Sequence, residues 1–424
     1  MSDKSKANKS FIAGSIGNVL EWYDFAVYGY FATIISANFF PKEDKVVALI
    51  ATFSIFAAGY LVRPLGGMIF GSMGDKYGRK KALTYSVFLM AIPTTLIGVI
   101  PTYHEIGFWA PAILTLLRLL QGLSVGGEFT GSISFVVETA PQNRRGLFGS
   151  FTVLGAVAGI LLGSLIGSIM GAVFDHATLN GWAWRLPFFA GIIIGLAGYF
   201  LRRHMQEGEE FAQLREAGKI AKSPIKEFWK DHKGKALSSA LSLFCFSVSF
   251  YMIFLYLASY THTFLKYSLD EALTINTLSM VLLVCLIPVM GHLSDKIGRK
   301  KVLIYGQIGF LIFTIPLFML IDQAEYWHIF IAQACFAVLV ATQQGAVPAM
   351  LVERFPTRIR YTGLAIAYNV GLAVFGGTTP MVSTWLIHQF NENVMMPGYF
   401  LMLSALISLI VLLTFRETYK DKLE

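Results

Sequence analysis

The segments GSMGDKYGRKK (Gly71–Lys81) and GHLSDKIGRKK (Gly291–Lys301) are near copies of each other, 220 residues apart in the chain. A weaker repeat sets ETAPQNRRG (Glu138–Gly146) beside ERFPTRIRYTG (Glu353–Gly363). The two pairs indicate that the chain is built from two halves of similar organisation. Parallel repeats are typical of membrane transporters, in which the substrate site lies between the repeats near the middle of the bilayer.

The composition agrees with a membrane protein. Of the 424 residues, 55% are apolar and only 14% are charged, and the mean hydropathy is +0.59. An ordinary soluble domain has about a quarter of its residues charged. Twelve helices of about 20 residues, each long enough for a hydrocarbon core of about 30 Å, fit this length. Disordered, fibrous and nucleic-acid-binding classes are excluded.

Long apolar runs predict twelve spans in two sets of six. The predicted fold is an all-α membrane protein of two six-helix bundles, residues 1–201 and 236–424, joined by a cytoplasmic linker at 202–235. The first six spans lie near 11–39, 47–71, 82–102, 109–138, 147–174 and 184–201. The second six lie near 236–264, 272–293, 302–321, 327–352, 361–389 and 398–415.

The basic residues predict the orientation of these spans. If the N-terminus and every even-to-odd connection share one side, that side holds 28 of the 34 basic residues. The opposite side holds Lys42, Lys45 and Lys266. By the positive-inside rule, both termini are cytoplasmic in a multi-pass protein of a bacterial inner membrane. The net charge of +8 therefore reflects topology and needs no acidic partner.

The doubled loop resembles the signature of the major facilitator superfamily. Within it, four segments resemble the metabolite:H+ symporter family, most closely its proline/betaine transporters: GNVLEWYDFAVYGY (17–30), RPLGGMIFG (63–71), QGLSVGGEFTG (121–131) and FPTRIRYTGLAIAYN (355–369). The resemblance implies import of a small zwitterionic osmolyte or amino acid together with protons, by alternating access. Proton symport of an organic acid, such as 2-oxoglutarate, citrate or shikimate, is the alternative. The long coiled-coil tail of osmosensory members has no counterpart after the last expected span.

Charged residues inside the predicted spans are confined to the first half. Ionisable side chains inside a membrane cost at least a few kcal/mol each and usually mark functional sites. The spans contain three carboxylates and two arginines, so one carboxylate has no opposite charge to balance it unless it carries a proton. These residues are Glu21, Asp24, Glu128, Arg63 and Arg118. We predict that Asp24 is the titrating group and that Arg118 controls its proton affinity, matching positions used in related sugar symporters; a static ion pair is the alternative. The predicted proton-coupling set is Asp24, Arg118, Glu21 and Glu128.

The second half offers polar and aromatic groups without charge in the middle of its spans. Aromatic faces hold an ammonium group by about 0.5 to 2 kcal/mol each, and an arginine can hold the carboxylate of the same zwitterion. A dicarboxylate would be expected to recruit a basic group from each half. The predicted substrate-binding residues are Trp22, Tyr28, Arg63, Gln121, Tyr251, Tyr256, Gln343, Gln344 and Asn369.

Charges of the repeated loops predict a gate on the cytoplasmic side. Their matched positions favour ion pairs that latch helices together, while the alternative is solvated positive-inside charge. The predicted cytoplasmic gate consists of Asp75, Arg79, Glu138, Asp295, Arg299 and Glu353.

No enzyme or cofactor is expected. Gly122–Gly126 matches the hydrolase pattern G-x-S-x-G, but it lies inside a predicted span, and no histidine is available there to serve as a base. An intramembrane serine hydrolase is therefore a remote alternative. The expected role of Gly122 is close packing of helices. The cysteines have no metal-type spacing, and no P-loop occurs. The coupling ion is expected to be H+, with Na+ as the alternative. The expected partners are a small-molecule substrate and membrane lipids, with no nucleic acid, and the protein is expected to act as a monomer.

Overall fold

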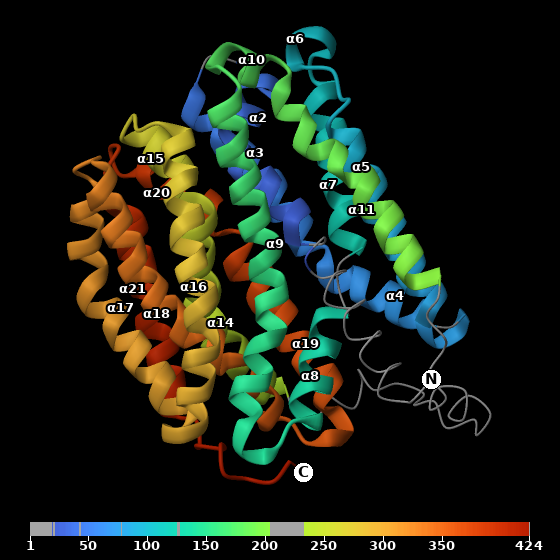
Figure 1. Ribbon diagram of the computed structural model, residues 1–424, viewed down its shortest axis with the longest axis vertical. Coiled ribbons are helices and arrows are strands. Elements are labelled where there is room, and N and C mark those ends of the chain that lie inside the picture. Colours follow the sequence, from blue (N-terminus) through green and yellow to red (C-terminus); the bar gives the residue numbers. More distant parts are fainter. Residues whose placement is uncertain are drawn as a thin grey trace.

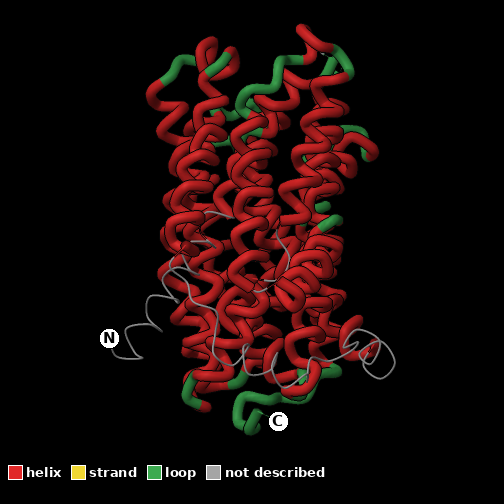
Figure 2. Tube along the Cα trace, turned by 90° about the vertical axis from the view of Figure 1, so that its right-hand side faces the viewer, coloured by secondary structure: helices red, strands yellow, loops and turns green. Residues whose placement is uncertain are grey.

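The computed structural model describes residues 22–41, 44–77, 79–124, 128–203 and 233–423, together with Val19. These residues are helical apart from short connections, and the described ranges contain no strand (Figure 2). Most helices run along the long axis of the molecule (Figures 1 and 2). The prediction of an all-α membrane fold is confirmed.

The first half contains a helix that covers residues 22–30 and continues into α2. The remaining elements of this half are α2 (Ala32–Phe39), α3 (Lys45–Leu61), α4 (Arg63–Tyr77), α5 (Arg79–Ile97), α6 (Tyr103–Ile106), α7 (Trp109–Ser124), α8 (Glu128–Thr139), η1 (Gln142–Arg144), α9 (Arg145–Val173), α10 (His176–Gly181), η2 (Ala183–Arg185) and α11 (Leu186–Arg203).

The second half consists of α14 (Lys233–Tyr251), η3 (Met252–Tyr256), α15 (Leu257–Phe264), α16 (Leu269–Ile297), α17 (Arg299–Ile321), α18 (Tyr326–Arg354), α19 (Thr357–Gly371), η4 (Leu372–Gly376), α20 (Thr379–Gln389) and α21 (Met396–Leu413). Two of its spans contain a π-helical turn, η3 and η4. Such turns release backbone carbonyls from the helical ladder and occur often at functional sites.

Described helices coincide with all twelve predicted spans. Nine are long and apolar enough to cross a membrane, and the shorter helices Thr84–Ile97 and Ala183–Ile193 are apolar as well. The first span is described only from residue 22 onward. Residues 204–232, which make up most of the predicted linker, lie outside the described residues, so the bundle boundaries stay a prediction.

The two halves meet along α9 and α16, which lie side by side over their whole length (Figure 1). Within the first half, α3 and α7 approach so closely that a Cβ on Gly122 would lie 1.9 Å from the carbonyl oxygen of Gly59. Only glycine allows such an approach. The packing role predicted for Gly122 is confirmed, and it brings Arg118, one turn earlier on α7, against α3.

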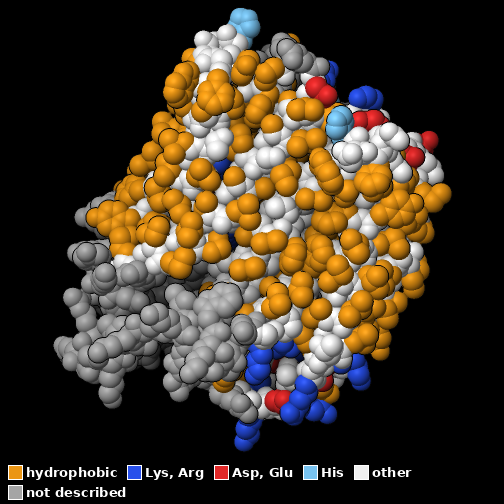
Figure 3. Space-filling model, turned by 180° about the vertical axis from the view of Figure 1, so that it is seen from behind, with side chains coloured by type: hydrophobic (Ala, Val, Ile, Leu, Met, Phe, Trp, Pro, Cys, Tyr) orange, Lys and Arg blue, Asp and Glu red, His pale blue; other side chains and the backbone are white. Residues whose placement is uncertain are grey.

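Positive charge gathers at one end of the molecule, below a broad hydrophobic surface (Figure 3). This "basic end" is formed by Gln142–Arg145, by Lys296–Lys301 and by the C-terminal segment 414–423. The repeated loop turns there at Gly298, whose φ of 109° favours glycine. The other end of the molecule is called the opposite end.

Candidate functional site

Two arginines are buried side by side in the first half. Arg63, at the start of α4, is 2% exposed, and Arg118, on α7, is 0% exposed. Both lie near the ring of Phe25, whose centroid is 5.7 Å from the guanidinium carbon of Arg63 and 4.8 Å from that of Arg118. Aromatic faces attract a desolvated cation, so these rings partly replace the water that the arginines have lost.

Each arginine has further aromatic neighbours of its own. The guanidinium carbon of Arg118 lies 4.3 Å from the ring centroid of Tyr28. That of Arg63 lies 5.2 Å from the ring of Trp22 and 5.1 Å from the ring of Tyr60. Each cation therefore has aromatic neighbours of its own and shares the ring of Phe25 with the other.

Asp24 is 2% exposed and lies in the same part of the first half. Its carboxylate oxygen Oδ2 accepts a hydrogen bond of 2.7 Å from the hydroxyl of Thr94 on α5. Thr94 also accepts a bond of 2.6 Å from the side-chain amide of Gln121, and Gln121 accepts one of 2.9 Å from Nη1 of Arg118. Asp24 and Arg118 are thus connected by three successive hydrogen bonds.

Among the ion pairs between described residues, none joins Asp24 directly to Arg118. The two charges still interact electrostatically across the cluster. The structure therefore brings the predicted proton-coupling pair together through Gln121 and Thr94. Glu21 and the side chain of Glu128, the other two predicted members, lie outside the described residues.

A narrow cavity lies between the two halves, near the middle of the molecule. Trp22, Phe129 and residues of α9 line it from the first half, and residues of α14, α18 and α19 line it from the second. None of the described residues that line it is charged. The described lining residues are Trp22, Phe129, Val153, Ala156, Val157, Ile160, Phe246, Ser247, Phe250, Tyr251, Gln344, Tyr368 and Leu372.

Three predicted substrate-binding residues, Trp22, Tyr251 and Gln344, line this cavity. Arg63 lies behind two of its rings, because it contacts the face of Trp22 and acts electrostatically on Tyr251. The hydroxyl of Tyr251 donates to that of Tyr60 at 2.8 Å, which links the cavity wall to the aromatic neighbours of Arg63. Arg63 is thus the described cation next to the cavity.

Other predicted substrate-binding residues lie elsewhere. Gln121 and Tyr28 belong to the surroundings of Arg118, and the hydroxyl of Tyr28 donates to the carbonyl of Thr52. Inside the second half, the hydroxyl of Tyr256 accepts from Thr384. The amide of Gln343 pairs with Gln307, and the amide of Asn369 donates to Ala365.

Several residues at the site escaped the sequence analysis. Tyr368 and Phe129 contact each other at 5.2 Å between ring centroids and form one wall of the cavity. In an apolar stretch of sequence, an aromatic residue that lines a cavity looks the same as one that packs in the core. Thr94 had a weak signal, since it is one of two threonines directly after Pro93 in the otherwise apolar stretch 87–100.

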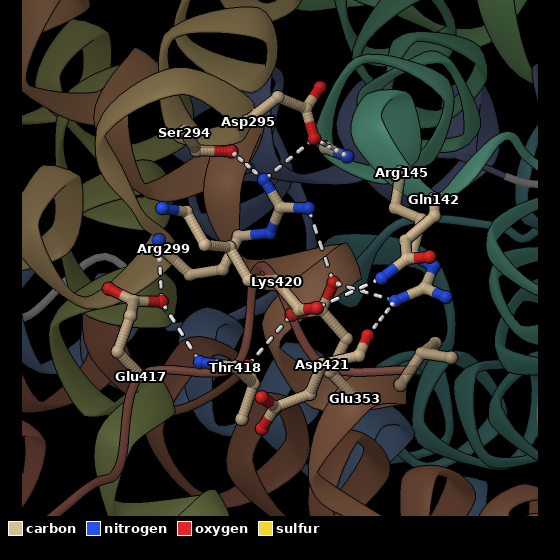
Figure 4. Close-up of polar contacts among 12 residues, drawn as sticks. Gln142, Arg145, Ser294, Asp295, Arg299, Glu353, Glu417, Thr418, Lys420 and Asp421 are labelled. Atoms are coloured by element: carbon tan, nitrogen blue, oxygen red, sulfur yellow. Dashed lines mark hydrogen bonds and ion pairs between the residues drawn. The ribbon is translucent and has the colours of Figure 1, made fainter. Parts of the chain in front are cut away.

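The basic end carries a cluster of ion pairs that joins the two halves (Figure 4). Asp295 accepts backbone hydrogen bonds from Gly146 at 2.8 Å and Leu147 at 2.9 Å, both on α9. Arg299 pairs with Asp295 at 2.8 Å and with Glu353 at 3.2 Å. Three predicted gate residues are therefore in direct contact, and Asp295 ties them to the first half.

The remaining gate residues are separate from this cluster. Glu138 pairs with Arg360 at 2.8 Å, a second ionic contact between the halves. The side chains of Asp75 and Arg79, in the first copy of the repeated loop, lie outside the described residues. The role of the six residues as a gate stays a prediction.

The C-terminal segment crosses the same cluster (Figure 4). Glu417 accepts from the backbone N–H groups of Arg299 at 3.0 Å and Lys300 at 3.1 Å, at the start of α17. The carbonyl of Asp421 accepts from Arg145, on α9, at 2.9 Å. This short segment thus bonds to both halves, a contact that the sequence did not predict.

The opposite end is joined by neutral groups. The hydroxyl of Tyr30 donates to the carbonyl of Phe254, in the π-helical turn η3, at 2.6 Å. The side-chain amide of Asn276 donates to Tyr30 at 3.0 Å and to Ser164, on α9, at 2.9 Å. Gln333 donates to Asn276 at 2.6 Å. Described residues therefore join the two halves on both sides of the central cavity.

Sequence profiles of transporter families match both halves of the chain. The Sugar (and other) transporter profile matches residues 10–209, and the Major Facilitator Superfamily profile matches residues 265–424. The proline/betaine transporter of Escherichia coli (strain K12) is 36% identical over 430 residues, which cover 98% of this chain and 85% of that protein. The glycine betaine/proline/ectoine/pipecolic acid transporter OusA of Dickeya dadantii (strain 3937) is 36% identical, covering 100% of this chain and 86% of that protein.

Solved structures of transporters share the fold. A partially occluded, inward-open structure of the xylose transporter XylE from E. coli superposes with a TM-score of 0.77 at 20% sequence identity, covering 99% of this chain and 100% of that one. A D-xylose-proton symporter gives a TM-score of 0.76 at 21% identity, with coverage of 99% and 100%. At this identity the likeness concerns the fold alone.

Proposed function

This chain belongs to the major facilitator superfamily and is related to its proline/betaine transporters, and we propose that it imports a small zwitterion of that class together with protons. The observation that carries the proposal is the aromatic cavity between the halves, whose described lining residues are uncharged, with Arg63 next to its wall. Trp22, Tyr251 and Tyr368 offer faces to a quaternary or secondary ammonium group. A rearrangement of Trp22 would bring the substrate carboxylate closer to the positive charge of Arg63.

We assign proton coupling to Asp24 and propose that the positive charge of Arg118 controls its proton affinity. Asp24 is buried, and among the described residues its carboxylate is joined to Arg118 through the neutral side chains of Thr94 and Gln121. A proton on Asp24 would therefore change the charge of the whole cluster. Each proton that enters across 100 mV contributes about 2.3 kcal/mol to uptake, in addition to the pH gradient. Sodium is the alternative coupling ion.

The contacts between the halves on both sides of the cavity support a mechanism of alternating access. Import would open the neutral contacts at the opposite end to admit the substrate, and then the ionic cluster at the basic end to release it. The positive-inside rule places the basic end and both termini in the cytoplasm of a bacterium, with the protein in the inner membrane. The cavity and both gates are built by one chain, which supports function as a monomer surrounded by lipid.

The organic-acid alternative fits this cavity less well. A dicarboxylate needs a second cation, and the described lining residues are uncharged. Arg185, the other arginine near a span, donates to the carbonyls of Gly98 and Ile100 and stacks on Trp184. An intramembrane hydrolase is disfavoured too, since the hydroxyl of Ser124 donates to the carbonyl of Gln121 in its own helix.

Uptake into proteoliposomes tests the proposal. Under an imposed inward pH gradient, labelled proline, glycine betaine, 2-oxoglutarate, citrate and shikimate are compared, each with and without sodium. Saturable uptake of proline or betaine that is abolished by a protonophore and indifferent to sodium is the expected result. Uptake of an organic acid with neither zwitterion transported would overturn the assignment of substrate, and a requirement for sodium would overturn that of the ion.

A further inference from the structure

We propose that Thr94 and Gln121 are positioning residues that connect the proton site at Asp24 to the guanidinium of Arg118. The inference rests on the proposed function, since it concerns how the proton on Asp24 acts on the rest of the first half. Thr94 has no assigned role, and Gln121 was expected among the substrate-binding residues.

The three hydrogen bonds that connect Arg118 to Asp24 have fixed directions, because the groups at the two ends of this series are charged. A guanidinium can only donate and an ionised carboxylate can only accept. Nη1 of Arg118 therefore donates to Oε1 of Gln121, which leaves Nε2 of Gln121 to donate to Oγ1 of Thr94. The hydroxyl of Thr94 then donates to Oδ2 of Asp24. All three bonds point the same way, so each polarises the next.

Arg118 depends on this series of hydrogen bonds for its own hydrogen bonding. Among the described residues, its guanidinium makes one hydrogen bond, to Gln121, and its Nε and Nη2 atoms are buried without a partner. The rings of Tyr28, Phe25 and Phe56 lie within 5.3 Å of its guanidinium carbon. The orientation of the Gln121 amide thus determines where the arginine is held.

Thr94 has two acceptors within reach, which lets it respond to the proton. Its hydroxyl lies 2.7 Å from Asp24 and 2.9 Å from the carbonyl of Met90 in its own helix. When Asp24 is ionised, the hydroxyl proton belongs on the carboxylate side, because a bond to a charged acceptor is stronger. When Asp24 is protonated, the hydroxyl can turn to Met90 and accept from the carboxyl group. The series of hydrogen bonds that starts at Arg118 then no longer ends on a negative charge.

Two described titratable groups interact electrostatically with Asp24 from the elements around it. Arg118 does so from α7, and Tyr23 does so from the same helix as Asp24. The hydroxyl of Tyr23 donates to the carbonyl of Pro187 on α11 and so points away toward that helix. Thr94 is the described group that donates directly to the carboxylate.

The test compares Thr94→Val with Thr94→Ser and with a neighbour. Thr95→Val is the matched control, since the hydroxyl of Thr95 donates to Ala91 in its own helix at 2.9 Å. In proteoliposomes, proton-driven uptake of labelled proline or glycine betaine and substrate exchange without a gradient are measured from pH 5 to 9. Exchange reports that each variant is folded and binds substrate.

Thr94→Val removes a donor to the ionised carboxylate, so the protonated form persists to higher pH. The pH dependence of proton-driven uptake should move up by about one unit, the scale of one hydrogen bond to a charged group. Thr94→Ser should restore the profile, and Thr95→Val should leave it in place. Gln121→Leu, which keeps the bond between Thr94 and Asp24, should cause a smaller shift without raising KM.

A profile of Thr94→Val that coincides with those of the wild type and Thr95→Val would overturn the inference. So would a Gln121→Leu variant that raises KM and leaves the profile unmoved, because that result assigns Gln121 to the substrate. A wild-type protein that shows no proton-driven uptake of either zwitterion would instead contradict the proposed function, so the two failures are distinguishable.

Discussion

The two halves of this molecule repeat one architecture but differ in the polar groups that they bury deep inside their spans. The first half buries Asp24, Arg63 and Arg118 there. The described buried charges of the second half, such as Arg299 and Glu353, lie at the basic end, whereas deeper in its spans the neutral amides of Asn276 and Gln333 form a network with hydroxyls of the first half. A buried charge is costly and responds to a proton or a counter-charge, whereas a satisfied neutral network does not. The difference assigns energy coupling to the first half and leaves the second to supply much of the substrate cavity.

The largest expected effect comes from removing the charge that distinguishes the first half. Asp24→Asn mimics the protonated form, so accumulation driven by protons should be lost while exchange persists. At 100 mV, the loss of one coupled proton lowers the accumulation ratio about 40-fold. Parallel assays of uptake and exchange measure this. Asp44→Asn, which alters an N-cap at the start of α3, should behave as the wild type. Gradient-driven accumulation by Asp24→Asn would show that the charge lies elsewhere.

A second prediction concerns the cavity that both halves share. Trp22→Ala removes an aromatic face contributed by the first half, and KM for the zwitterion should rise about 10-fold, since such a face holds an ammonium by roughly 0.5 to 2 kcal/mol. Trp22→Phe should recover most of this loss. Trp385, 48% exposed on α20, supplies the control Trp385→Ala. Equal KM values for the two alanine variants would remove the cation–π argument.

A third prediction compares the two copies of the repeated loop. Asp295→Asn weakens an ion pair and two bonds to α9, so the basic end should open with a bias of about 2 kcal/mol. Asp75→Asn should bias the population by about 1 kcal/mol, the scale of a partly screened charge.

Spin labels at the basic ends of α8 and α18 report the distance distribution. Asp322→Asn, at the far end of α17, is the control for the same chemical change. If the distributions of both loop variants match that of the wild type, the loops carry only solvated positive-inside charge.

The smallest expected effect belongs to the C-terminal segment. Glu417→Gln keeps the shape of the side chain but removes a charge from the N-terminus of α17, where a carboxylate contributes about 0.5 to 1 kcal/mol. The same labels should show a shift toward the open basic end, two- to five-fold in population. Glu392→Gln, at the opposite end, should produce no shift. A Glu417→Gln distribution identical to that of the wild type would restrict the segment to a passive covering.

Much of this picture follows from the sequence alone. The span count, the repeat and the family are encoded locally, because hydropathy and loop motifs act over a few turns of chain. That the charged residues inside the predicted spans all belong to the first half was visible for the same reason, and it pointed to Asp24 and Arg118. These features need no knowledge of how one helix is rotated against another.

Rotation and packing between helices decided the rest. Thr94 meets Asp24 from 70 residues away. Gln121, which shares a face of α7 with Arg118, meets Thr94 because close packing of α3 and α7 at Gly59 and Gly122 fixes the orientation of α7. The same holds for Tyr368 at the cavity. A helix presents about 3.6 residues per turn, so a small rotation changes which side chain enters a site, and only contacts between distant segments select that rotation.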